Sequence, residues 1–288
     1  MTTDLPWFIF SRMSDQYRTR SEGWVKAKKE GHLNEDSLTT RTITPEIQNI
    51  LREGEEVISI EGGGIKELSV VTIFGYKAPS KTDKKIVTNQ RTINISLKKS
   101  NAGQVYLLPS YKFFSGFEIW YDKEVPAEVG EIITLFTGES PDIKDVLQIE
   151  SVRIQNQQVS KSQRTRRLCF DALMEYDKEK VDTTIQWFKD NIGLITDFVF
   201  KRGLSDSKDE FADYIYYKNF LDKTSPMNHI LKIDDFTQLC QDNSHTIELG
   251  SRYGKTSIQL PFGHLQMHKG MLQFHHNFNK IVSLLGNG

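Results

Sequence analysis

Short runs of apolar and β-branched residues, separated by turn-forming residues, follow one another from residue 57 to residue 97. This alternation is typical of strands, whereas longer segments with apolar residues at three- and four-residue spacing are typical of helices. The last two runs flank Asn89-Gln90-Arg91 and therefore predict a hairpin. We expect strands at 57–60, 68–74, 84–88 and 92–97.

Helical patterns precede and follow these strands. Thr44-Pro45-Glu46 predicts a helix start, because Thr caps the first turn, Pro suits its first position and Glu interacts with the positive end of the helix dipole. The apolar stretch 105–121 is ambiguous by periodicity alone. We expect further helices at 142–152, 168–200, 209–221 and 228–242, then two strands at 256–260 and 266–274.

These elements predict a mixed α/β protein (α+β in arrangement) in two parts. We expect residues 1–125 to form a strand-rich core with an N-terminal helix, and residues 126–288 to form a helical region that ends in a β-hairpin. The length of 288 residues suits one large domain or two small ones, and 38% hydrophobic residues are enough for a packed core.

Charge and composition exclude several classes of protein. With 37 Lys and Arg against 38 Asp and Glu, the net charge is −1, which excludes a generally basic, histone-like binder but permits a local basic groove. The chain contains no apolar stretch long enough for a membrane span and no secretory signal pattern at its start. Its two cysteines cannot form a disulfide framework or a thiolate zinc site. We therefore expect a cytoplasmic protein without a membrane partner.

Two motifs resemble known sites and differ from them in spacing or context. The segment 250–256, Gly-Ser-Arg-Tyr-Gly-Lys-Thr, has one residue too few between its glycines for a nucleotide-binding loop. Four histidines gather near the C-terminus, where two interpretations stay open: metal ligation, or a surface that contacts phosphates. These histidines are His264, His268, His275 and His276.

Basic residues form local clusters in this nearly neutral chain. Each cluster is either a solvated face or a set of contacts to a phosphate backbone. One lies at 161–167, and another consists of Lys77, Lys81, Lys84 and Lys85. The residues that we assign to nucleic-acid contacts are Lys99, Arg164, Arg166, Arg167, Arg252 and Lys255.

The predicted hairpin carries the strongest chemical signal. In its second strand Asn94, Ser96 and Lys98 share one face. A turn centred near Gln90 would bring Asp83 opposite Lys98. A carboxylate beside a lysine at the end of a sheet is an arrangement that metal-dependent phosphodiester hydrolysis uses, because the carboxylate holds the metal and the lysine orients the nucleophile. The alternative is a cross-strand ion pair that protects a sheet edge.

A helix, a strand, an acid-bearing hairpin and a strand that ends in x-Lys together resemble the PD-(D/E)xK nuclease superfamily, over roughly residues 44–120. The segment 81–88, Lys-Thr-Asp-Lys-Lys-Ile-Val-Thr, looks like the strand with the first acid, and 93–100, Ile-Asn-Ile-Ser-Leu-Lys-Lys-Ser, like the strand with the family lysine. The resemblance implies a restriction-endonuclease-like core in which Asp83 is the first acid and Lys98 the lysine.

The resemblance also implies a Mg²⁺ or Mn²⁺ cofactor. Ser96 stands where the family usually has its second acid, two residues before the lysine. Some restriction enzymes have this Ser-x-Lys pattern and take the missing glutamate from elsewhere, so Glu67 or Glu118 would complete the metal ligands around Asp83, and Glu46 is a further upstream acid. If none of these glutamates reaches the site, the fold would bind without cleaving.

The function that this resemblance implies is a metal-dependent DNA endonuclease, most like a type II restriction enzyme of a restriction-modification system. We expect a homodimer if it cuts both strands, because one such site hydrolyses one strand at a time. Two alternatives stay open: an inactive nuclease fold that binds nucleic acid or protein, and a phage structural or assembly protein. The near-zero net charge and the aromatic segments permit the last of these.

Overall fold

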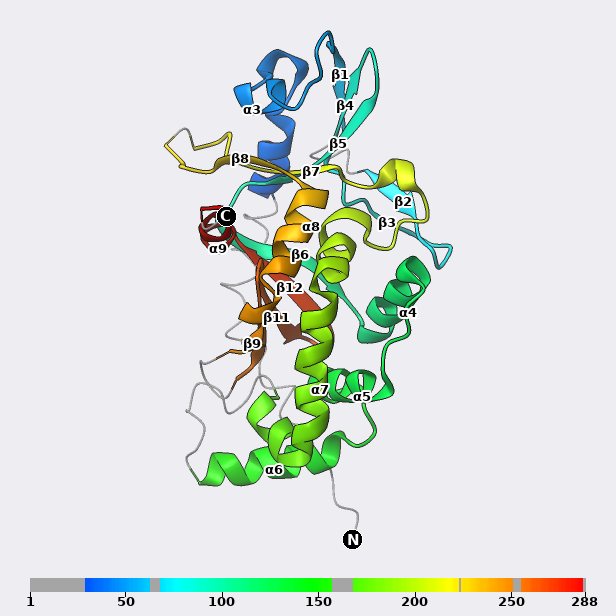
Figure 1. Ribbon diagram of the computed structural model, residues 1–288, viewed down its shortest axis with the longest axis vertical. Helices are drawn as coiled ribbons and strands as arrows, with labels where there is room; N and C mark the ends of the chain where they lie inside the picture. Colours follow the sequence, from blue (N-terminus) through cyan, green and yellow to red (C-terminus); the bar gives the residue numbers. More distant parts are fainter. Residues whose placement is uncertain (1–28, 63–67, 157–167, 223, 251–254, 287–288) are drawn as a thin grey trace.

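The computed structural model describes residues 29–62, 68–156, 168–222, 224–250 and 255–286. Two five-stranded sheets lie one after the other along the long axis of the molecule, and helices cover the second sheet (Figure 1). The predicted mixed α/β class is confirmed. The strand expected at 266–274 is wrong, because a turn at Lys269-Gly270 divides that stretch between two paired strands, 263–268 and 271–277, and a helix follows them.

The first sheet has the strand order β1-β4-β5-β7-β8. Its neighbouring strands are antiparallel except β5 and β7, which run parallel. The aliphatic side of the β4–β5 hairpin packs into a small core with the helix α3 (Pro45–Gln48), where Thr44 caps the first turn as predicted. The strands are β1 (Val57–Glu61), β4 (Lys84–Thr88), β5 (Thr92–Lys98), β7 (Tyr214–Lys218) and β8 (Asn228–Lys232).

The second sheet has the order β6-β12-β11-β10-β9 and is antiparallel throughout. Its apolar face packs against the helices in the larger core, where rings such as Phe113, Phe198 and Phe274 lie in contact. Its strands are β6 (Ala102–Leu108), β9 (Glu248–Leu249), β10 (Ser257–Leu260), β11 (Gly263–His268) and β12 (Met271–Asn277).

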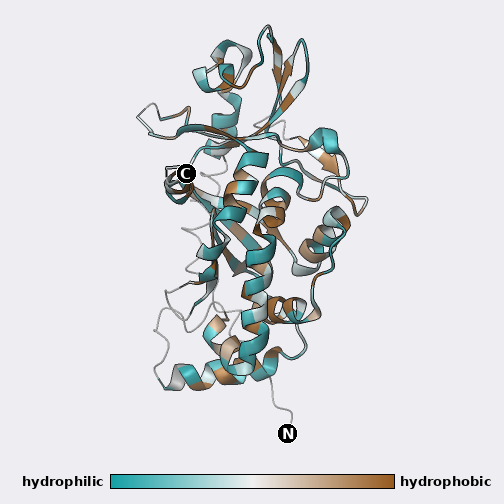
Figure 2. Ribbon diagram, viewed as in Figure 1, coloured by the Kyte–Doolittle hydropathy of each residue, from teal (hydrophilic) through white to brown (hydrophobic). Residues whose placement is uncertain are grey.

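The helices around this core carry hydrophilic and hydrophobic residues along their length, as expected for helices between a core and solvent (Figure 2). No helix in the described ranges is long and apolar enough to cross a membrane. The helices are α4 (Ser110–Tyr121), α5 (Ala127–Thr137), α6 (Ile143–Gln155), α7 (Phe170–Asp197), α8 (Ile233–Asp242) and α9 (Phe278–Leu285), and the π-helical segment η2 (Phe198–Arg202) continues α7.

Short elements connect the two sheets to the helices. A two-stranded sheet of β2 (Ser69–Val71) and β3 (Lys77–Pro79) lies between β1 and β4 in the chain, and residues 29–36 form a helix. The described residues also contain the 3₁₀ turns η1 (Thr40–Thr42), η3 (Lys208–Glu210) and η4 (Ser244–Thr246).

Two of the expected helices differ from the structure. The helix expected at 209–221 is wrong, because residues 214–218 form β7 in the interior of the first sheet. The helix expected at 228–242 begins only at Ile233, after the strand β8. The ambiguous stretch 105–121 contains most of β6 and then α4. Both sheets combine strands from before and after residue 125, and the two-part division of the chain stays a prediction.

Candidate active site

Asp83, the residue before β4, is fixed by the backbone of β5. Its N–H donates to the carbonyl of Ile95 at 2.9 Å, and its carboxylate oxygen Oδ2 accepts the N–H of Leu97 at 2.6 Å. The Ser96 hydroxyl donates to the same oxygen at 3.2 Å. Because backbone groups make two of these three bonds, the carboxylate is held in place without dependence on flexible side chains.

Lys98 completes a group of three side chains with Asp83 and Ser96. Its ammonium Nζ donates to the Ser96 hydroxyl at 2.7 Å and lies 3.6 Å from Asp83 Oδ2. Ser96 is 3% exposed, whereas the side chains of Lys98 and Asp83 are 19% and 25% exposed. The serine therefore lies beneath a carboxylate and an ammonium that solvent can still reach. We call these three residues the hairpin trio.

The residue that stands opposite Asp83 across the hairpin differs from the expected one. Lys84 pairs with Ile95, so Asp83 stands opposite Ser96 rather than opposite Lys98. The cause is a tight turn in which the Thr88 N–H donates to the Arg91 carbonyl, so the turn is centred between Asn89 and Gln90. Lys98 still meets Asp83, because alternate residues of β5 share a face and the lysine side chain is long.

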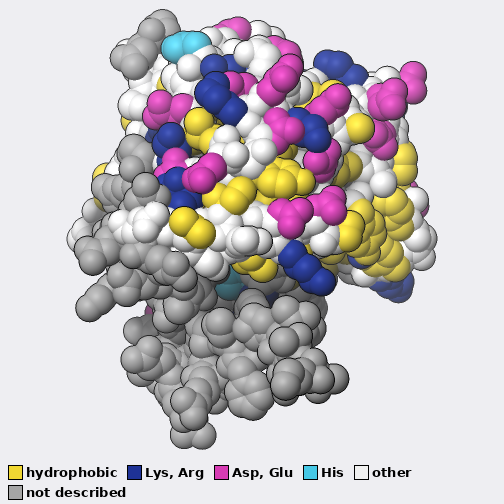
Figure 3. Space-filling view, turned by 90° about the horizontal axis from the view of Figure 1, so that it is seen from below, with side chains coloured by type: hydrophobic (Ala, Val, Ile, Leu, Met, Phe, Trp, Pro, Cys, Tyr) yellow, Lys and Arg dark blue, Asp and Glu magenta, His cyan; other side chains and the backbone are white. Residues whose placement is uncertain are grey.

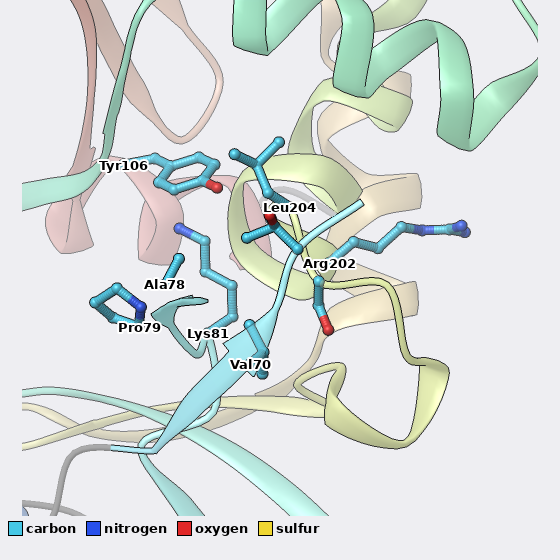
Figure 4. Close-up of a pocket in the computed structure, with 10 residues that line it drawn as sticks. Val70, Ala78, Pro79, Lys81, Tyr106, Arg202 and Leu204 are labelled. Carbon is cyan, nitrogen blue, oxygen red and sulfur yellow. The ribbon is translucent and has the colours of Figure 1, made fainter. Parts of the chain in front are cut away.

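The basic cluster of residues 77–85, interpreted from the sequence as a solvated face or as phosphate contacts, includes one buried lysine, Lys84, and one half-buried lysine, Lys81. Lys84 is 5% exposed and donates to the Gly62 carbonyl at 2.7 Å. Lys81 donates to the Val105 carbonyl at 3.1 Å, and its ammonium lies 3.4 Å from the centre of the Tyr106 ring (Figure 4). Burial, with the charge of Lys98 as a smaller cause, lowers the pKa of Lys81 well below its usual range, even though Asp83 acts in the opposite direction.

The close approach of Lys81 to Tyr106 depends on a glycine. A Cβ atom at Gly203 would lie 3.1 Å from Lys81 Cε and 3.2 Å from the Tyr106 hydroxyl, and the backbone φ of Gly203 is +56°. These residues enclose a cavity of about 10 Å³, room for roughly one water molecule (Figure 4). Sequence reasoning missed this second lysine beside the trio, although its position two residues before Asp83 places both on one face of the chain.

His276 lies on the side of Lys98 that faces the second sheet. It is 2% exposed, and within the described ranges its Nδ1 atom has no hydrogen-bond partner. Burial, together with the charges of Lys98 and His275, lowers the pKa of His276 to about 3. The imidazole is therefore neutral at physiological pH and adds no charge beside the lysine.

The other C-terminal histidines belong to a polar face of the second sheet. His264 and His275 stack at 4.6 Å between ring centres, and His275 Nε2 lies 2.9 Å from the amide of Gln266. Over the part of the chain that the structure describes, no group of three or more His, Cys, Asp or Glu side chains is arranged to hold a metal ion. The metal interpretation of these histidines therefore has no support from the described geometry.

Three glutamates are the candidates for further magnesium ligands beside Asp83. Glu118 lies on α4, where its carboxylate accepts the Val125 N–H at 3.0 Å, and no described contact links it to Asp83. Glu46 accepts the Tyr216 hydroxyl and the Asn228 amide near α3. Glu67 lies outside the described residues.

The trio nevertheless fits a hard cation that is held mainly by water and phosphate. Both hydrogen bonds to the Asp83 carboxylate and its lysine contact involve Oδ2, so Oδ1 accepts no hydrogen bond from the described part of the chain. Mg²⁺ is commonly bound through one or two carboxylates, with waters and substrate phosphates supplying the remaining oxygens. One carboxylate oxygen at a partly exposed position meets the minimum of that requirement.

The residues assigned to nucleic-acid contacts are mostly paired or not described. The Lys99 ammonium donates to Glu30 at 3.0 Å, and Lys255 lies 3.4 Å from Asp171. Arg164, Arg166, Arg167 and Arg252 lie outside the described residues. On the face seen in Figure 3, acidic and basic side chains intermingle among the described residues.

Comparison with solved structures gives a structural similarity. The chain is similar to a crystal structure of the restriction endonuclease MspI in complex with its cognate DNA, with a TM-score of 0.43 and 12% sequence identity over 94% of this chain and 93% of that chain. No protein-family model matches the sequence. No curated protein matches it either.

Proposed function

We propose that this protein is a metal-dependent DNA endonuclease, and the observation that carries the proposal is the convergence of Asp83, Ser96 and Lys98. A fixed carboxylate, a buried hydroxyl and an ammonium meet within 2.7–3.6 Å at the open end of the β4–β5 hairpin. Hydrolysis of a phosphodiester needs charge stabilisation at the phosphate and a positioned water. The hairpin trio supplies one group for each need.

Each residue of the trio has a distinct role in this proposal. Asp83 Oδ1 would hold Mg²⁺ or Mn²⁺, which offsets charge on the phosphate and activates water when it is bound. Lys98 contacts the scissile phosphate or orients the attacking water. Ser96 acts through Lys98, because its hydroxyl accepts a hydrogen bond from the Lys98 ammonium and fixes the direction of that group.

Glu67 is the proposed second carboxylate. The residues on either side of 63–67 lie beside Asp83, since a Cβ at Gly62 would come within 3.1 Å of the Asp83 carbonyl and 2.9 Å of Leu68 Cγ. Glu118 is the alternative second carboxylate, and one of its oxygens accepts the Val125 N–H at 3.0 Å.

A type II restriction activity within a restriction-modification system, acting on duplex DNA, is the specific form of the proposal. One trio hydrolyses one strand, so we propose a homodimer where both strands are cut at one site.

The direct test is cleavage of plasmid and phage DNA by the purified protein with Mg²⁺ or Mn²⁺, and with EDTA as the control. We expect discrete fragments from the parent protein and at least a roughly 100-fold lower rate from Lys98→Ala. The control is Lys178→Ala, which removes an exposed lysine of α7 that is paired with Asp182 and has no part in the proposed site. Equal rates in Lys98→Ala and the parent would contradict the assignment of the site, and no cleavage with either metal would contradict the enzyme.

A second candidate is a nucleic-acid-binding module with this architecture and no chemistry. It is favoured by Ser96 in the position of an acid and by the single carboxylate that the described residues bring to the trio. DNA that shifts on a gel with the parent protein, but is never cut, would identify this candidate. Neither cleavage nor a shift would contradict both.

A further inference from the structure

The turn between β2 and β3 carries two parallel aromatic rings. The rings of Phe74 and Tyr76 lie with their centres 6.4 Å apart and their planes 7° from parallel. Thr72 closes the turn, because its N–H donates to the Tyr76 carbonyl at 2.8 Å and its carbonyl accepts the Gly75 N–H at 2.7 Å. The φ of Gly75 is +78°, a conformation that glycine adopts without strain. The turn therefore holds the backbone of both aromatic residues in place.

Lys112, on α4, connects this turn to a third ring. Its ammonium donates to the Tyr76 hydroxyl at 3.0 Å and lies 4.3 Å from the centre of the Tyr76 ring and 5.9 Å from the centre of the Tyr111 ring. Phe74, Tyr76 and Tyr111 are 38%, 37% and 60% exposed, and no other Phe, Tyr or Trp side chain in the described ranges is as exposed. Apolar side chains that gather at one exposed place indicate a binding surface, whereas isolated ones are normal. We call these three rings and Lys112 the aromatic patch.

The charges around the aromatic patch are mainly positive. The two segments that carry the patch, 69–80 and 109–117, contain Lys77 and Lys112 and no acidic residue. Neither lysine has an acidic partner in the described part of the chain. Asp206 meets the same small sheet through its N–H, which donates to the last carbonyl of β2. One acid against two lysines without acidic partners leaves an excess of positive charge, which favours an anionic partner.

Nucleic acid with unpaired bases has the chemistry that this patch fits. Bases stack on exposed aromatic rings, and lysines beside the rings contact the phosphates. An acidic peptide would use the lysines but not the rings, and an apolar protein surface would use the rings but not the lysines. Inside a duplex the neighbouring bases cover both faces of each base, so stacking on the patch requires a base that has left the duplex or belongs to a single strand.

We propose that the aromatic patch binds a single-stranded segment of DNA, with bases stacked on Tyr111 and on the Phe74–Tyr76 pair and with phosphates beside the two lysines. The inference rests on the proposed function for the placement of that segment. Tyr76 precedes Asp83 by seven residues, which span at most about 23 Å, or about seven nucleotides of a strand. The patch is therefore within reach of a strand whose scissile phosphate lies at the hairpin trio.

The first experiment measures the binding of a labelled oligothymidylate strand by fluorescence anisotropy, with EDTA present so that nothing is cut. Tyr111→Ala is expected to weaken binding at least about fivefold because a stacking ring is lost, whereas Tyr111→Phe keeps the ring and should stay within about twofold of the parent. The matched control is Ile119→Ala, which removes a side chain of the same helix that is 56% exposed and has no aromatic ring. Equal affinity of Tyr111→Ala and the parent, or an equal loss in Ile119→Ala, would overturn the proposal.

The second experiment tests the phosphate contacts through the salt dependence of the same binding. For single strands, the logarithm of the association constant falls with the logarithm of the salt concentration by about 0.7 for each phosphate contact. Lys77→Ala, at an exposed position, is expected to make this slope less steep by about that amount. Lys178→Ala removes an exposed lysine that is paired with Asp182 on α7, and it should leave the slope unchanged. A slope that is the same in Lys77→Ala and the parent, or that changes equally in both variants, would refute the contact between Lys77 and the strand.

The third experiment separates this inference from the nuclease proposal and from a protein interface. Plasmid cleavage, oligothymidylate binding and sedimentation are measured on the parent and on Tyr111→Ala. Strand binding that depends on Tyr111, without plasmid cleavage by the parent, would refute the nuclease and support the patch. Cleavage by the parent without strand binding would refute the patch alone. A parent dimer that dissociates in Tyr111→Ala, with strand binding unchanged, would identify the patch as an interface between two copies of the chain and overturn the proposal.

Discussion

The β4–β5 hairpin holds a carboxylate paired with a cation at each end, and the two pairs differ in how fully they are satisfied. At the turn end, the Glu55 side chain has no exposed surface and accepts bonds from Arg91 Nε, Thr88 and the Arg52 N–H at 2.7–3.0 Å. At the open end, Asp83 takes its bonds on one oxygen and keeps a quarter of its side chain exposed.

The difference separates an acid whose two oxygens both have donors from an acid that keeps one oxygen for a ligand. Both oxygens of Glu55 have donors, so this acid has no capacity left for a ligand, and its removal would leave partners unpaired. Asp83 has an oxygen that accepts no hydrogen bond from the described residues, and solvent reaches the Lys98 ammonium beside it. The carboxylate therefore has room to bind a metal ion, and the ammonium has room to contact a phosphate. Substitutions at the open end should therefore lower DNA cleavage, and substitutions at the turn end should lower the free energy of unfolding.

The largest effect is expected at the open end. Asp83→Asn keeps the shape and the acceptor for the Leu97 N–H but removes the charge, so we expect DNA cleavage to fall by about 10³-fold, the scale of losing a group that stabilises transition-state charge. Stability should change by less than about 1 kcal/mol, because the site is partly exposed. Cleavage rates and urea denaturation of the same preparation check both. Loss of stability in step with activity would make Asp83 a structural acid like Glu55.

The opposite result is expected at the turn end. Glu55→Gln leaves the Arg91 guanidinium, whose side chain is 28% exposed, without its charged partner, which should destabilise the protein by about 2 kcal/mol. Cleavage per folded molecule should stay within about twofold of the parent, because Glu55 lies at the far end of the strands from the trio. Chemical denaturation gives the first value, and cleavage measured well below the melting temperature gives the second. A large specific loss of cleavage would remove the contrast between the two ends.

The pH dependence of stability sharpens the same contrast. Burial by itself would raise the pKa of Glu55, but its bonds from Arg91, Arg52 and Thr88 outweigh burial and lower the pKa to about 2. A lowered folded-state pKa gives stability that is present above the unfolded value of 4.5 and is lost as pH falls from there towards 2. Unfolding free energy followed by denaturation at a series of pH values should drop over this window in the parent and should be flatter in Glu55→Gln. Parallel curves for the two proteins would exclude Glu55 as the source.

The hairpin was predictable because its information is local. Its β-branched runs and the turn residues between them specify two paired strands, and the alternation of β5 places Ser96 and Lys98 on one face. The exact register was not predictable, because it depends on whether Gln90 or the bond between Asn89 and Gln90 is the turn centre, and that choice moves the partner of Asp83 by one residue.

What the sequence did not reveal depends on contacts between distant segments. The strand at 214–218 lies inside the sheet and parallel to β5, so Tyr214-Ile-Tyr-Tyr has no alternation to distinguish it from a helix. The burial of Lys81 and Lys84 is decided by carbonyls at Val105 and Gly62, to which no local pattern points. The contact between the Glu118 carboxylate and the Val125 N–H is likewise one that no local pattern indicates.

The smallest effect is expected on the aliphatic face of the hairpin, near its open end. Ile95 is fully buried in the small core beneath the hairpin, while its carbonyl accepts the Asp83 N–H on the strand edge. Ile95→Val removes one methyl group and should cost about 1 kcal/mol of stability without changing the backbone bond that positions Asp83. Cleavage should therefore stay within twofold of the parent, which denaturation and rate measurements together would check. A cleavage loss above about tenfold from this one methyl group would mean that the core side of β5 sets the geometry of the trio, and the two faces of the hairpin could not be treated as separate.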